Sequence, residues 1–113
     1  MSVKNRVNAI PVTAIDTVVL DDVYELLNPG GLPEPCFLLR IINNSDVGLE
    51  ISYDGSTQHD FVAANTTLNL PVQTNSQPTN KTALFPKGTT VYVNGSTGTG
   101  VVYLAGYYQP VSL

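Results

Sequence analysis

The chain is 113 residues long, only 12% of them are charged, and the formal net charge is −4. This length has room for one domain with one modest core. The five cationic residues are scattered, which argues against nucleic acid as a partner, and a single cysteine rules out an intrachain disulfide and a Cys/His zinc site. No apolar stretch approaches the roughly 18 residues of a membrane span, so we expect no membrane partner and no cleavable secretion signal. We also expect no cofactor.

The first half of the chain reads as extended segments separated by turns. Residues 12–20 are rich in β-branched side chains and predict a strand. Residues 21–27 fit a short strand or a two-turn helix, and the alternation of apolar side chains favours the strand. Residues 36–43 predict a strong strand that opens on a buried, inert Cys36 thiol. Residues 48–54 alternate cleanly, and we expect them to pair with 36–43 as a hairpin.

The second half continues the same pattern. Residues 60–64 and 67–72 predict short strands, and two more cover 89–94 and 100–108. The last two are joined by a short glycine-bearing loop, which is typical of a hairpin. Seven or eight short strands at intervals of about 8–12 residues predict an all-β, antiparallel β-sandwich, with a jelly roll as its natural form.

The last strand is apolar on both of its faces. Val101, Tyr103, Ala105 and Tyr107 alternate with Val102, Leu104 and Tyr108. The strand that contains Leu38, Arg40 and Ile42 behaves similarly, although the outer face of a lone sandwich is usually polar. Either loops or the N-terminal segment cover these faces, or another subunit covers them with the tyrosines as anchors. Arg40 is then an edge arginine with a partner in its own chain, or part of an ion pair between subunits.

Residues suited to catalysis are few. His59 is the only histidine, and Asp60 beside it points to the opposite face of a strand. Asp54 and Asp60 flank a turn near His59, which leaves a glycosidase-like or metal site open, but aspartate is common in turns because its side chain bonds its own backbone. We therefore expect no enzymatic activity, no catalytic residue and no metal site.

Four blocks of the sequence resemble small virion structural proteins of tailed bacteriophages. They are RIINNS at 40–45, ISYDGSTQHDF at 51–61, KGTTVYVNG at 87–95 and GVVYLAGYY at 100–108. The likeness covers residues 36–110 and rests on short blocks and on texture. It implies a sandwich or jelly roll that assembles in rings or clusters and has no catalytic residues to transfer.

The resemblance also implies a division of the chain and a set of partners. Residues 1–11 would form an extended arm, in which 3–10 reach a neighbour, and residues 12–113 the single β-sandwich domain. The protein would be a head–tail connector or neck ring component, or else a capsid decoration (cement) protein. It would form a homo-oligomer, bind capsid, portal or tail proteins, and reside in the virion after assembly in the bacterial cytoplasm.

The candidate interface follows from the two-sided strands and from the expected arm. Its predicted residues are Val3, Arg6, Leu38, Arg40, Tyr92, Tyr103, Tyr107 and Tyr108. If the second hairpin forms, the four tyrosines fall on neighbouring strands. Stacked tyrosines on a sheet are also typical of sugar-binding modules, so a carbohydrate-binding β-sandwich is the alternative function.

Overall fold

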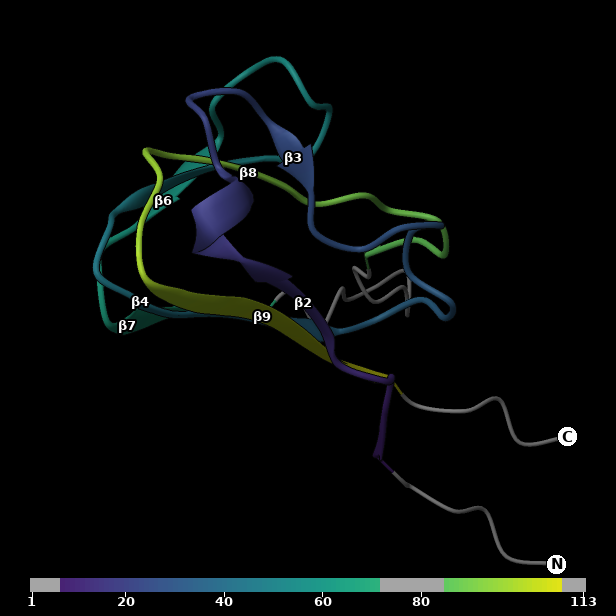
Figure 1. Ribbon diagram of the computed structural model, residues 1–113. Coiled ribbons are helices and arrows are strands. Elements are labelled where there is room, and N and C mark those ends of the chain that lie inside the picture. The colour runs from purple at the N-terminus through teal and green to yellow at the C-terminus, as the bar shows by residue number, and fades with distance from the viewer. Residues whose placement is uncertain (1–6, 72–84, 109–113) are drawn as a thin grey trace, which may run out of the picture.

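The computed structural model describes residues 7–71 and 85–108, and over these the chain forms two antiparallel sheets packed as a sandwich (Figure 1). This confirms the predicted all-β fold class. The five-stranded sheet contains β1 (Asn8–Ala9), β2 (Thr13–Asp16), β4 (Leu38–Ser45), β7 (Thr66–Pro71) and β9 (Gly100–Tyr108). The four-stranded sheet contains β3 (Glu25–Leu26), β5 (Leu49–Ser52), β6 (Asp60–Val62) and β8 (Tyr92–Asn94).

The strand pairing is nested. The five-stranded sheet has the order β1-β9-β4-β7, with β2 also paired to β9, and the other sheet has the order β3-β8-β5-β6. Thus β5 pairs with β6, β4 with β7, β3 with β8 and β2 with β9. From β2 to β9, every connection except β5 to β6 passes from one sheet to the other.

Both predicted hairpins are therefore wrong. The strands β4 and β5 belong to different sheets, and so do β8 and β9. At the first corner, the buried Asn43 amide donates hydrogen bonds to the carbonyls of Val47 (2.7 Å) and Ala63 (3.1 Å). These bonds hold the turn after β4 against the segment that connects β6 to β7. Alternation along a strand sets which side chains face inward, but it does not say which strand is the neighbour.

The second corner is held by similar bonds. In the loop between β8 and β9, the Gly95 carbonyl accepts a hydrogen bond from the Asp22 amide (3.0 Å), and the Thr99 amide donates one to Asp46 Oδ1 (2.9 Å). Its partners thus come from two other corner segments. A five-residue loop that makes such bonds passes between the sheets and does not close a hairpin.

The segment predicted as one strand over 12–20 is interrupted. Strand β2 ends at Asp16, and a short 3-10 helix, η1 (Thr17–Val19), follows it. The Asp16 side chain accepts a hydrogen bond from the Val18 amide at 2.9 Å and so caps this turn. Residues 21–27 take the extended alternative, since β3 is their only regular element.

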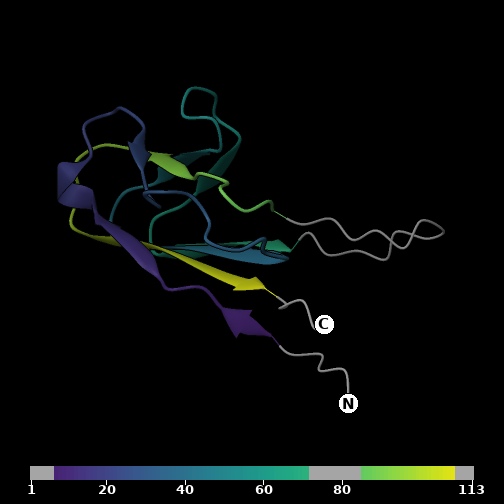
Figure 2. The ribbon, with the colours of Figure 1, turned by 90° about the vertical axis from the view of Figure 1, so that its right-hand side faces the viewer.

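The core lies between the sheets. Its side chains come from the inward-facing positions of the central strands, and Leu39, Ile41, Leu49, Ile51, Val93, Val102 and Leu104 are all 0% exposed. Cys36 is also fully buried and free, as predicted. Burial, followed by the charge of Glu34, raises the pKa of its thiol. Ile10, from the expected arm, packs in the same core, and β1 and β2 follow one another along the edge of β9 (Figure 2).

Candidate interaction surfaces

The outer side of the five-stranded sheet carries a group of half-buried, mostly apolar side chains around one arginine, which we call the Arg40 face; its alanine, Ala105, is only 8% exposed. It consists of Leu38, Arg40, Ile42, Tyr103, Ala105 and Tyr107. The register of β4 and β9 places these side chains in three opposed pairs, namely Leu38 with Tyr107, Arg40 with Ala105, and Ile42 with Tyr103. Residues on either side of each position point into the core, because side chains alternate along a strand. The predicted interface residues Leu38, Arg40, Tyr103 and Tyr107 are thus brought together.

Arg40 lies at the centre of this face. Its Nε donates a hydrogen bond to Asn69 Oδ1 of β7 at 3.3 Å. Among residues 7–71 and 85–108, no carboxylate lies within ion-pair distance of its guanidinium. Arg40 thus has a neutral partner, Asn69, in its own chain, as one of the two expected alternatives has it, and its other guanidinium N–H groups can still donate to a further acceptor.

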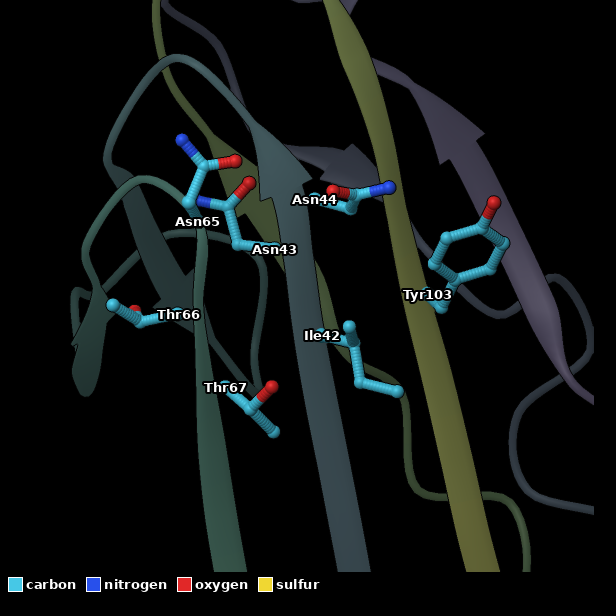
Figure 3. Close-up of a pocket in the computed structure, with 7 residues that line it drawn as sticks. All are labelled: Ile42, Asn43, Asn44, Asn65, Thr66, Thr67 and Tyr103. Carbon is cyan, nitrogen blue, oxygen red and sulfur yellow. The ribbon is translucent and has the colours of Figure 1, made fainter.

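A hollow of about 190 Å³ opens at one end of the Arg40 face. Figure 3 shows Ile42, Thr67 and Tyr103 on three neighbouring strands of this sheet. Its lining is completed by Asn43, Asn44, Asn65 and Thr66. The hollow therefore offers neutral amide and hydroxyl groups beside one aromatic ring.

The remaining predicted interface residues lie elsewhere. Tyr92 is on β8, in the other sheet, because β8 and β9 do not form a hairpin. Tyr108 is half-buried against the core. The predicted face of four tyrosines is therefore wrong, and two tyrosines share the Arg40 face. Val3 and Arg6 lie outside the described residues.

The four-stranded sheet carries a second outer surface that the sequence analysis missed, and we call it the Glu50 face. It consists of Tyr24, Leu26, Glu50, Phe61 and Tyr92. Glu50 is opposed to Phe61 across β5 and β6, and Leu26 is opposed to Tyr92 across β3 and β8. Phe61 is 56% exposed, which is unusual for an aromatic side chain of this size. Glu50 thus lies among apolar and aromatic side chains, with the polar Asn94 directly opposed to it across β5 and β8.

Among residues 7–71 and 85–108, Glu50 is only partly engaged in hydrogen bonds. The Tyr24 hydroxyl donates a hydrogen bond to Glu50 Oε1 at 3.2 Å. Desolvation, this hydrogen bond and the charge of Glu50 together raise the pKa of Tyr24. The hydrogen bond leaves the second carboxylate oxygen available. The only sequence signal for this face is the alternation of Glu50 with Leu49 and Ile51, because the aromatic members come from three other segments.

The loop around Asp54 and His59 contains the side chains that left a glycosidase-like or metal site open in the sequence. Asp54 Oδ1 accepts hydrogen bonds from the amides of Ser56 (2.8 Å) and Thr57 (2.9 Å). These bonds, with smaller help from Ser52 and His59, hold the pKa of the Asp54 carboxyl well below its usual range. Asp54 therefore acts as the turn aspartate that the sequence favoured.

His59 is tied to the same loop. Its Nδ1 accepts the Tyr53 amide at 3.0 Å, its ring stacks on Tyr53 with centroids 5.3 Å apart, and its Nε2 lies 3.9 Å from Asp54 Oδ2. Asp60 instead accepts a hydrogen bond from the Tyr53 hydroxyl at 2.7 Å. The imidazole nitrogen that would act as a base is thus occupied by a backbone donor. This arrangement braces the loop.

Comparison of the chain with protein-family models, curated proteins and solved structures found no match. Within residues 7–71 and 85–108, no group of three or more metal-ligating side chains comes together. In the same residues, no helix has the length and apolar character needed to cross a membrane.

Proposed function

We propose that this protein is a non-enzymatic assembly protein whose copies associate through the Arg40 face. The observation that supports this most strongly is the register of β4 and β9, which collects two tyrosines, three aliphatic side chains and one arginine at the centre of a sheet. Aromatic residues and arginine are the types most enriched in the centres of protein interfaces. The low charge of the chain, 12%, offers little protection against such association.

We further propose that the particle is a tailed-bacteriophage virion. The four sequence blocks that resemble phage virion proteins support this assignment. So does the nested strand pairing, from which we infer a jelly roll, a fold used by viral capsid proteins. In such a virion the protein would serve as a head–tail connector or neck ring component, or as a decoration protein. It would bind capsid, portal or tail proteins.

The Arg40 face is small, which sets the expected strength of the contact. Its six residues lie on two neighbouring strands about 4.8 Å apart and span five residues, about 17 Å, along each strand. This is at the low end for a specific interface. We therefore expect assembly that depends on protein concentration, with neighbouring copies or virion partners adding to its stability.

Analytical ultracentrifugation over a range of concentrations tests self-association. We expect the wild-type chain to assemble and the Leu38→Ser/Tyr107→Ser variant to remain monomeric with an unchanged circular dichroism spectrum. Val18→Ser serves as a control, because Val18 is 61% exposed and lies outside both faces. A wild-type chain that stays monomeric at millimolar concentration would contradict the proposal. Mass spectrometry of purified virions tests the assignment to the particle, which fails if the chain is absent from them.

A second candidate function, glycan binding, is favoured by the hollow beside Tyr103. Neutral amides and hydroxyls next to an aromatic ring are suited to sugar hydroxyls and to a sugar face. A glycan array with the wild-type chain and the Tyr103→Ala and Asn44→Ala variants tests this. Binding that both variants lose would support it, whereas variants that change assembly and leave glycan signals flat would exclude it.

A further inference from the structure

We propose that the Arg40 face of one copy binds the Glu50 face of the next, with Arg40 and Glu50 forming an ion pair at the centre of the contact. This inference rests on the proposed self-association and specifies its partner surface. It follows from the similarity of the two faces. Each lies on the outer side of a sheet and carries aromatic and aliphatic side chains around one charged group, and these two groups have opposite sign. The polar Asn94 lies opposite Glu50, and the exposed Asp16 lies on β2 at the edge of the other sheet.

The hydrogen bonds of the two charged groups leave both of them able to bind further partners. Arg40 gives its Nε to Asn69, and Glu50 takes the Tyr24 hydroxyl on Oε1. The terminal guanidinium N–H groups and Glu50 Oε2 remain for a second partner. An apolar contact that buried either charge alone would carry a desolvation penalty, and an opposite charge across the contact offsets it.

The same charges disfavour the alternative contacts. Two Arg40 faces packed together would place two cations at the centre, and two Glu50 faces would place two carboxylates there, so like charges would repel in both contacts. Few cationic side chains of the described residues could pair with Glu50. Of the described residues, only Arg40 and Lys87 are lysine or arginine, and Lys87 lies in an exposed turn away from both sheets. Of these two residues, Arg40 is therefore the one that lies on the outer side of a sheet and could pair with Glu50.

The position of the two faces determines the kind of assembly. They are the opposite outer sides of one sandwich, with the core between them (Figure 1). A contact between unlike faces leaves one face of each kind free on every pair, so further copies add in the same way. Such a heterologous contact closes into a ring if the rotation between copies allows it and otherwise continues as a filament. Two copies would stack their sheets about 10 Å apart with strands within about 30° of each other.

Charge exchange tests this pairing. The single variants are Arg40→Glu and Glu50→Arg, measured by ultracentrifugation alone, mixed in equal amounts, and combined in one chain. Each single variant places like charges at every contact, so we expect its dissociation constant to rise at least about tenfold. The mixture and the double variant restore an opposite pair at every contact, and we expect assembly within about threefold of the wild type.

Lys87→Glu and Glu34→Arg make the same charge changes at exposed positions outside both faces, and we expect them to assemble like the wild type. If Arg40→Glu prevents assembly and Glu50→Arg has no effect, the contact uses the Arg40 face without Glu50, which overturns the inference and leaves the proposed self-association intact. The reverse result shows a contact that uses Glu50 without the Arg40 face, which overturns both. Loss in both single variants without rescue also overturns the pairing. A wild-type chain that is monomeric throughout overturns the self-association itself.

Discussion

Asn43 provides the most direct test of how the chain passes from one sheet to the other. Its side chain is 1% exposed and follows Leu39 and Ile41 on the inner side of β4, where Ser45 is the other buried polar residue. Its Nδ2 donates hydrogen bonds to the Val47 and Ala63 carbonyls at 2.7 and 3.1 Å, and its Oδ1 accepts the Ser45 hydroxyl. Three hydrogen bonds at about 1 kcal/mol each predict that Asn43→Ala lowers the free energy of unfolding by about 3 kcal/mol.

Urea denaturation followed by circular dichroism measures this loss. With an m value of about 1–3 kcal/mol/M for a small domain, the midpoint is expected to fall by about 1–3 M. The matched control is Asn44→Ala, because Asn44 is exposed and its loss is expected to change the unfolding free energy by less than about 0.5 kcal/mol. A loss below about 1 kcal/mol for Asn43→Ala would show that the corner is held by something other than this amide.

Three further comparisons test the core, a turn and a carboxylate. Leu104→Ala, at a fully buried position, should destabilise by about 2–5 kcal/mol, whereas Tyr103→Ala, on the outer face one residue earlier, should affect assembly more than folding. Gly31→Ala should destabilise more than Gly30→Ala, because both glycines have positive φ but only a Cβ at Gly31 would overlap a backbone carbonyl. Because the Asp54 pKa is lower in the folded state, its stabilisation is present above about pH 4 and lost as the pH falls further. The unfolding free energy of Asp54→Asn should therefore fall less than that of the wild type between about pH 6 and pH 3.

Each of these expectations has a clear contrary result in thermal or urea unfolding. Equal destabilisation by the two substitutions at 103 and 104 would contradict the assignment of these residues to opposite faces. Equal effects at the two glycines would contradict the close approach at Gly31. An acid dependence of unfolding that Asp54→Asn leaves unchanged would contradict the role of that carboxylate in the loop.

Much of the local structure could be predicted from the chain alone. The alternation of Leu49 and Ile51 with polar neighbours predicted which side chains enter the core. The two strands that are apolar on both sides predicted four residues of the Arg40 face, namely Leu38, Arg40, Tyr103 and Tyr107. The capped turn after Asp16 was missed because β-branched residues such as Val18 and Val19 suit a strand equally well. A single aspartate that bonds the following backbone is enough to end the strand there.

The sequence determined most of the strands and their inward and outward faces, because alternation depends on neighbours along the chain. It also determined the low charge, which is a property of composition alone. Only the tertiary structure decided which strands lie side by side. It separated Tyr92 from Tyr103 and gathered Tyr24, Glu50, Phe61 and Tyr92 into one face from four distant segments. The physical reason is that the two-residue period of a strand is a local property, whereas pairing is decided by corner hydrogen bonds, such as those of Asn43, between residues remote in sequence.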